Sequence, residues 1–200
     1  RVDIITGTFG KALGGGAGGF TAGPQEITRM LRQRSRPYLF SNSLPSAACA
    51  SALKALEIVD KYPELRTKIY ENTLYFRENI QAMGFEIKGE SHPIVPIMIR
   101  DPKLAQEMAR RLLEHGILVV AFSFPVVPKG EDRIRIQISA AHEKSHLKKA
   151  LVAFNTAGSG QHNQVTFNAN NVPTPPVSPP ILFTDTVQTL PQLKFFSGDA

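Results

Sequence analysis

Cysteine is almost absent from this chain of 200 residues, and other signals that would assign a function class are missing as well. The single cysteine, Cys49, excludes an intramolecular disulfide framework, and no CxxC motif or Cys/His cluster offers the ligand spacing of a zinc site. No apolar run approaches the roughly 18 residues of a membrane span. The opening residues RVDIIT lack the apolar region and cleavage site of a signal peptide. We expect a reducing compartment, with the cytoplasm and the mitochondrial matrix both open.

The charge is basic but is not concentrated on one segment. Lysine and arginine number 23 against 17 aspartates and glutamates, a formal net charge of +6, yet the basic residues alternate with acidic ones, as in ARRLLEH. This mixture disfavours a nucleic-acid-binding surface. The sequence also lacks the nucleophile elbow of a hydrolase. We therefore expect neither nucleic acid nor a membrane among the partners.

Composition divides the chain near residue 155. Before that point, periodic segments alternate with short turns, whereas residues 156–200 lack a helical period and are rich in Asn, Thr and Pro. Such a composition is typical of a linker or a disordered tail.

Strands and helices interleave through the first part of the chain. Strands are predicted at residues 2–6, 18–22, 85–89, 94–100, 117–122 and 133–139, and helices at residues 24–34, 45–62, 63–83, 102–115 and 142–154. This alternation predicts an α/β or α+β unit with helices packed on a mixed sheet.

A lysine, Lys11, stands inside the glycine-rich stretch GTFGKALGGGAGGF. Residues 14–19 satisfy GxGxxG, but an extended pattern follows instead of the helix that a dinucleotide site needs, and the spacing also fails for a Walker loop. One interpretation is a solvated lysine on a flexible turn. The other is a Schiff-base lysine at the end of a buried strand, with Thr8 nearby and glycines that admit a planar ring.

Two further stretches carry residues suited to anion binding. Ser41 and Asn42 stand in SNSLP, which is either a helix-capping turn or a set of donors for a phosphate. Arg133 and Arg135 alternate along RIRIQIS and therefore share one face of a strand. They are either solvated arginines of an edge strand or partners of a carboxylate.

The segment DIITGTFGKALGG resembles the lysine segment of pyridoxal-phosphate (PLP) enzymes of the α-oxoamine synthase family, and the resemblance runs from Val2 to about Phe154. It implies the aspartate aminotransferase-like α/β fold, fold type I. The segments would be residues 1–44 at the end of the large PLP-binding domain, connecting helices at 45–83, a small α+β C-terminal domain at 84–155, and a tail at 156–200 unlike the family.

The resemblance also implies roles for individual residues. Lys11 would be the catalytic lysine that carries PLP, and Thr8 would lie beside the cofactor. Ser41 and Asn42, within RQRSRPYLFSNSLP, would reach the cofactor phosphate of the neighbouring subunit in a homodimer. Arg135 would bind the substrate carboxylate, with Arg133 as its salt-bridging neighbour, and PVVPKG would lie near the reacting centre.

The implied activity joins glycine to acetyl-CoA, giving 2-amino-3-ketobutyrate and CoA, as in threonine and glycine metabolism. Members that form 8-amino-7-oxononanoate or 5-aminolevulinate are alternatives. The family's preceding segment, with an Asp for the pyridine nitrogen and a His stacked on the ring, is not in this sequence, so we expect an incomplete acyltransferase. A non-catalytic remnant is the alternative.

Overall fold

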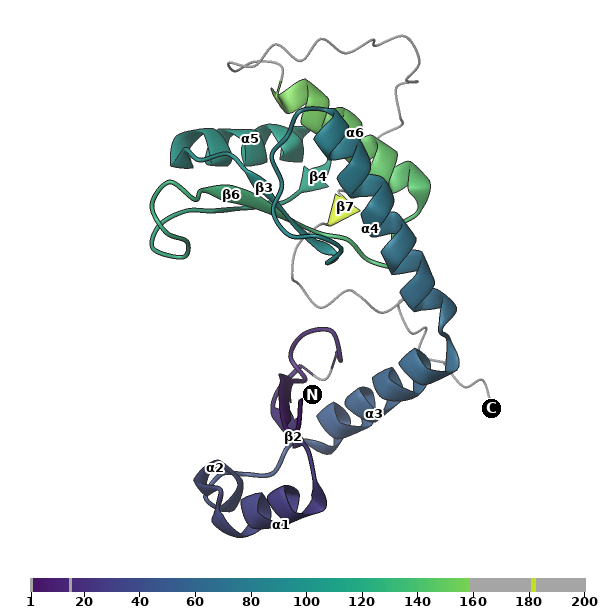
Figure 1. The fold of residues 1–200 in the computed structure, drawn as a ribbon, viewed down its shortest axis with the longest axis vertical. Coiled ribbons are helices and arrows are strands. Elements are labelled where there is room, and N and C mark those ends of the chain that lie inside the picture. The colour runs from purple at the N-terminus through teal and green to yellow at the C-terminus, as the bar shows by residue number, and fades with distance from the viewer. Residues whose placement is uncertain (1, 15, 159–180, 183–200) are drawn as a thin grey trace, which may run out of the picture. The chain divides into compact units, whose positions relative to one another are not determined.

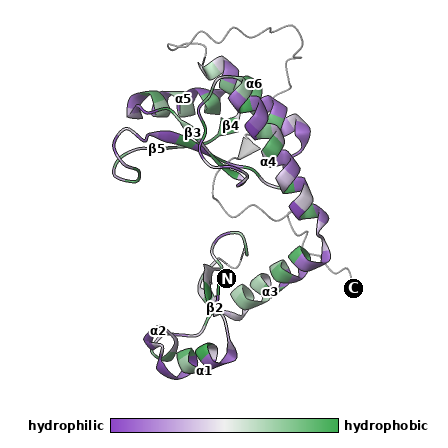
Figure 2. Ribbon diagram, in the orientation of Figure 1, coloured by the Kyte–Doolittle hydropathy of each residue, from purple (hydrophilic) through white to green (hydrophobic). Residues whose placement is uncertain are grey.

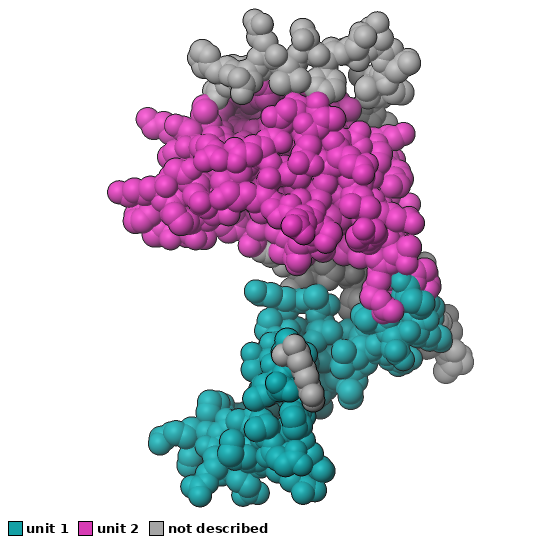
Figure 3. Space-filling model, in the orientation of Figure 1, with its two compact units in different colours: residues 1–63, 186–200 teal, residues 64–185 magenta. Residues whose placement is uncertain are grey.

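A computed structural model describes residues 2–14, 16–158 and 181–182 (Figure 1). The chain forms two compact units, whose described residues fall within Arg1–Pro63 and Glu64–Asp185 (Figure 3). The predicted tail at 156–200 lies outside the described residues except at its first three and at 181–182. The predicted division into segments 1–44, 45–83, 84–155 and 156–200 follows the domain boundaries of the family and stays a prediction.

The first unit opens with a two-stranded antiparallel sheet. Strand β1 (Ile5–Thr8) pairs with β2 (Gly19–Ala22), with Thr8 opposite Gly19, so the loop that carries Lys11 connects the two strands. The predicted order of strand, loop and strand is confirmed. The predicted burial of the first strand is wrong, because Ile5 remains 55% exposed in the described structure, where only β2 pairs with the strand.

Three helices complete the first unit. Helix α1 (Gln25–Arg34) has no buried residue, and the short α2 (Arg36–Leu39) was not predicted. Helix α3 (Ser46–Lys61) buries three alanines at helical spacing, Ala48, Ala52 and Ala55. Its ribbon is mostly green to pale in Figure 2, in keeping with its alanine and leucine content.

The second unit places helices on one face of an antiparallel sheet. Its helices are α4 (Glu64–Ala82), α5 (Pro102–Glu114) and α6 (Lys144–Gly158). Its strands are β3 (Ile94–Met98), β4 (Ile117–Leu118), β5 (Val120–Phe122), β6 (Arg133–Gln137) and β7 (Ile181–Leu182). The three-stranded sheet has the order β3-β6-β5 and is antiparallel throughout, and β4 pairs with β7 in parallel.

Alternation along β3 and β6 separates the core from the opposite face of the sheet. Val95, Ile97, Ile134 and Ile136 are fully buried and join one hydrophobic cluster with residues of α4, α5 and α6. The residues between them, including Arg133 and Arg135, are half-buried on the other face. The sequence alternation RIRIQIS therefore matches the observed faces, as expected for side chains with a period of two.

Two sequence predictions of strands are corrected in this unit. Residues 85–89 contribute only a single bridge, Ile87 to Ile97, and the predicted strand at 117–122 is divided into β4 and β5. The strand predicted at 94–100 ends at Met98, because Arg100 adopts a left-handed backbone conformation with φ of 63°. A strand cannot continue through such a residue.

Candidate functional site

Lys11 lies in the turn that follows β1, and its side chain is exposed. The turn closes through the Gly14 N–H, which donates to the Lys11 carbonyl oxygen at 2.9 Å. The Phe9 N–H donates to the Gly18 carbonyl oxygen at 3.0 Å. The two bonds thus fix the base of the loop and the turn within it, where Lys11 is exposed.

The Thr8 side chain forms two hydrogen bonds within the same loop. Its hydroxyl donates to the Gly18 carbonyl oxygen at 3.2 Å and accepts from the Gly10 N–H at 3.1 Å. The predicted proximity of Thr8 to the lysine loop is thus seen in the structure. What Thr8 contributes to a bound cofactor stays a prediction.

Glycines permit the close approach of the two strands beneath the loop. A Cβ on Gly19 would lie 2.6 Å from the backbone oxygen of Gly7, and a Cβ on Gly7 would lie 2.5 Å from the Phe20 ring. Gly18 has a φ of +81°, a conformation that side-chain-bearing residues rarely adopt. The glycine density noted in the sequence therefore has a structural cause at these positions.

A contact that sequence reasoning missed ties the lysine loop to α3. The Ser51 hydroxyl donates to the Gly14 carbonyl oxygen at 3.0 Å, across 37 residues of sequence. Nothing in the local pattern around Ser51 indicates this bond, because it depends on how α3 packs on the loop. Ser51 is a support for the loop that carries Lys11.

Ser41 and Asn42 are exposed between α2 and α3. Helix α3 begins after Pro45, and no side chain caps its first turn. The interpretation of SNS as a helix cap is therefore not supported. The structure places Ser41 and Asn42 in the same unit as Lys11 but on a different loop.

Arg135 belongs to the second unit and Lys11 to the first. The contacts of Arg135 are therefore described within the second unit. The Arg135 guanidinium carbon lies 4.5 Å from the centroid of the Phe122 ring. Strand β6 presents Arg133 on the same face, two residues before Arg135. Phe122 is a second residue that sequence reasoning missed, because strand register is not readable from the two segments alone.

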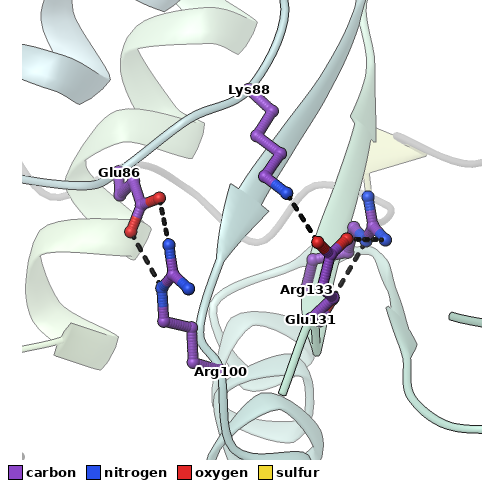
Figure 4. Close-up of polar contacts among 5 residues, drawn as sticks. All are labelled: Glu86, Lys88, Arg100, Glu131 and Arg133. Atoms are coloured by element: carbon purple, nitrogen blue, oxygen red, sulfur yellow. Dashed lines mark hydrogen bonds and ion pairs between the residues drawn. The ribbon is translucent and has the colours of Figure 1, made fainter. Parts of the chain in front are cut away.

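Arg133 is held by an ion-pair network (Figure 4). Its Nη2 donates to Glu131 Oε2 at 3.0 Å, and Lys88 Nζ donates to Glu131 Oε1 at 3.0 Å. The hydrogen bond from Lys88, with the nearby charges of Lys88 and Arg133, lowers the pKa of Glu131 below its ordinary value. Arg133 is thus a salt-bridging neighbour of Arg135, as predicted.

Figure 4 also shows Glu86 and Arg100, which form a separate pair beside this network. Arg100 Nε donates to Glu86 Oε2 at 3.0 Å. The pair lowers the pKa of Glu86, chiefly through this hydrogen bonding. It fastens residue 86 to the segment that follows β3.

The part of the chain that the structure describes contains no cluster of three metal-ligating side chains. Within the same residues, none of the helices is both long and apolar enough to cross a bilayer.

Known proteins similar to this chain include two named 2-amino-3-ketobutyrate coenzyme A ligase. The one from Escherichia coli K12 is 52% identical over 158 residues, covering 79% of this chain and 40% of its own length. The mitochondrial one from Bos taurus is 48% identical, covering 79% and 38%. An 8-amino-7-oxononanoate synthase from Symbiobacterium thermophilum is 40% identical, covering 79% and 40%. This chain thus spans about two fifths of the length of the curated relatives it matches.

The fold is similar to that of solved enzymes. A structure of serine palmitoyltransferase (SPT) with PLP superposes with a TM-score of 0.74 at 30% identity, covering 78% of this chain and 40% of that one. The model of the family described as aminotransferase class I and II matches residues 1–154. The predicted resemblance and fold class are confirmed. The chain therefore belongs to the aminotransferase class I and II family of enzymes.

Proposed function

We propose that this chain carries the lysine segment and the small domain of a PLP-dependent C-acyltransferase, a glycine C-acetyltransferase that condenses glycine with acetyl-CoA. The products are 2-amino-3-ketobutyrate and CoA. The observation that carries the proposal is the 52% identity to the E. coli ligase over 158 residues. The bovine relative supports it, since its name states the same ligase.

The residues around Lys11 fit PLP. An exposed primary amine is the group that binds an aldehyde, and it stands on a loop rich in glycine. A Cβ at Gly16 would meet nothing within 4 Å, and one at Gly10 would meet its nearest atom, the Thr8 hydroxyl oxygen, at 3.5 Å. The loop therefore leaves room for a planar ring beside the lysine.

The proposed site residues have different tasks. PLP, when bound, supplies a ring that withdraws electrons from the Cα of an attached amino acid. Lys11 Nζ would bind the aldehyde carbon and later take the Cα proton. The Arg135 guanidinium would bind the glycine carboxylate and orient the Cα–H bond. Correct orientation of reacting groups can lower an activation barrier by about 7 kcal/mol. Ser41 and Asn42 would donate to the cofactor phosphate in a neighbouring subunit of a homodimer.

The 40% identity to an 8-amino-7-oxononanoate synthase favours a second candidate, another α-oxoamine synthase that uses a different acyl donor. The two candidates share Lys11 chemistry and differ in product. Mass spectrometry of a reaction with glycine and acetyl-CoA separates them, because only the first candidate forms 2-amino-3-ketobutyrate.

The mitochondrial name of the bovine relative makes the mitochondrial matrix the compartment to examine for a eukaryotic source, with the cytoplasm for a bacterial one.

The proposal is tested by mapping where PLP attaches. The full 200-residue chain is mixed with PLP, reduced with borohydride and digested, and the modified lysine is identified by peptide mass spectrometry. We expect modification at Lys11, suppressed when glycine is added first, and none at that peptide in Lys11→Ala. Modification spread over exposed lysines such as Lys54 and Lys103, unaffected by glycine, would contradict the role of Lys11. Lys11→Ala should also abolish acetyl transfer.

A further inference from the structure

The two arginines of β6 share a face of the sheet but have different partners. Arg133 Nε donates to the Glu131 carbonyl oxygen at 3.0 Å and its Nη2 to the Glu131 carboxylate at 3.0 Å. Arg135 instead lies over the ring of Phe122, with 4.5 Å between the guanidinium carbon and the ring centroid. Arg133 is therefore paired with a carboxylate, and Arg135 has the ring of Phe122 among its contacts.

The strand register explains how Phe122 reaches Arg135. In the β5–β6 pair, Phe122 is opposite Arg133 and Val120 is opposite Arg135. Phe122 is thus the diagonal neighbour of Arg135 on the same face, a separation that an aromatic side chain spans. Both side chains are half-buried, so partial removal of water strengthens the contact between the cation and the ring.

Stacking and carboxylate binding use different parts of a guanidinium. The ring contacts the flat face of the group, whereas a carboxylate is bound in the plane, at its N–H edge. A bidentate pair needs this plane in one orientation, and an arginine side chain loses much rotamer freedom when it is fixed. A ring 4.5 Å from the guanidinium carbon therefore restricts the movement of Arg135, and the N–H edge is the part that a carboxylate would contact.

Glu131, four residues before Arg135, is engaged by two other cations. Glu131 accepts from Lys88 at 3.0 Å and from Arg133 at 3.0 Å, as Figure 4 shows. With two cations on one carboxylate, Glu131 is satisfied by Lys88 and Arg133.

We propose that Phe122 is a positioning residue that sets the orientation of the Arg135 guanidinium and thereby the affinity for the substrate carboxylate. The inference rests on the proposed function, in which Arg135 binds the carboxylate of the amino acid. It adds a residue on β5 to the determinants of amino-acid binding. The matched variants are Phe122→Leu, which removes the ring, and Phe122→Tyr, which keeps it.

The contact itself is tested by NMR of the full chain labelled with ¹⁵N. The arginine Nε–H signal of Arg135 is assigned by its loss in Arg135→Lys. We expect a ring-current shift of this proton in the wild type and in Phe122→Tyr, and its loss in Phe122→Leu. Tyr70→Leu, which removes an exposed ring on α4 of the same unit, should leave the signal in place. An unchanged signal in Phe122→Leu would overturn the proposal.

The consequence for binding is tested by steady-state kinetics with glycine and acetyl-CoA. We expect Phe122→Leu to raise the KM for glycine by roughly tenfold, the size of one such contact, with kcat changed less than about twofold. Phe122→Tyr should restore the wild-type KM. A fall in kcat at constant KM would contradict a positioning role. If Lys11 of the wild-type chain is not modified by PLP, the proposed function fails, while the NMR experiment still decides whether Phe122 orients Arg135.

Discussion

Arg77 shows how a single buried charge can be accommodated without a carboxylate. The residue is 4% exposed, and its guanidinium donates to the backbone carbonyl oxygens of Lys88, Gly89, His92 and Ile94. Burial lowers the pKa of Arg77, although the group stays protonated because an arginine side chain begins from so high a value. The residue thus ties the segment before β3 to helix α4.

Removing this side chain should destabilise the second unit. We expect Arg77→Ala to lower the free energy of unfolding by about 2–3 kcal/mol, because backbone carbonyls lose their donors in a buried site. Denaturant unfolding followed by circular dichroism measures the change. Gln81→Ala, an exposed substitution on the same helix, is the control and should change stability by less than about 0.5 kcal/mol. Equal effects of the two variants would contradict a structural role for Arg77.

At the scale of single elements, helix α5 is reinforced along its exposed side by charge pairs. Arg110 contacts Glu107 through two bonds, Nε to Oε2 at 2.9 Å and Nη2 to Oε1 at 2.7 Å, and Arg111 Nε adds a third at 2.9 Å. Arg110 also pairs with Glu114. The bonds from Arg110 and then Arg111 lower the pKa of Glu107 to about 2.

The direction of this shift sets the pH dependence of α5. Because the folded pKa of Glu107 lies below its ordinary value of 4.5, the carboxylate contributes stability that is complete above pH 4.5 and is lost as the pH falls through about 2. We expect Glu107→Gln to lower the Tm slightly at neutral pH. The difference in Tm between this variant and the wild type should disappear as the pH falls from 4.5 to about 2. Added salt should reduce it, since the pairs face solvent.

A control separates this effect from general loss of charge. Glu78→Gln removes an exposed glutamate of α4 that has no ion pair among the described residues. Its Tm difference should be small at every pH. A pH-independent difference for Glu107→Gln would contradict the assigned pairs.

Local periodicity identified the helices well and the strands less completely. The helix predicted at 63–83 is found as Glu64–Ala82 and that at 102–115 as Pro102–Glu114, because apolar spacing, Pro and Gly mark helices within a short stretch of sequence. The segment 85–89 alternates like a strand, but it forms only one bridge. Pairing depends on a partner far along the chain, which alternation does not reveal.

The same distinction applies to the candidate site. Lys11, Thr8 and Arg135 were identified from short motifs and a family resemblance. Ser51, which bonds Gly14 at 3.0 Å, and Phe122, which lies under Arg135, were missed because their contacts depend on packing and register. The residues proposed to bear the chemistry were readable from the sequence, and the residues that contact them required the structure.

At the scale of the whole molecule, an apolar surface on α3 bears on association. Leu53, Leu56 and Val59 are 68%, 49% and 43% exposed, while the buried positions of the helix are alanines. Neighbouring large apolar side chains exposed on one helix are unusual for a soluble monomer and typical of an association surface. The proposed homodimer would cover such a surface.

We expect the isolated chain to self-associate, and sedimentation velocity over a range of concentrations measures this. The double variant Leu53→Glu, Leu56→Glu should shift the chain toward the monomer, because burying two carboxylates in an apolar contact is unfavourable. The control Lys54→Gln, Lys61→Gln changes the net charge by the same amount on the same helix and should leave association in place. A wild-type chain that sediments as a monomer at every concentration would contradict both the role of α3 and the proposed sharing of a site between subunits, because Ser41 and Asn42 could then reach no neighbouring cofactor.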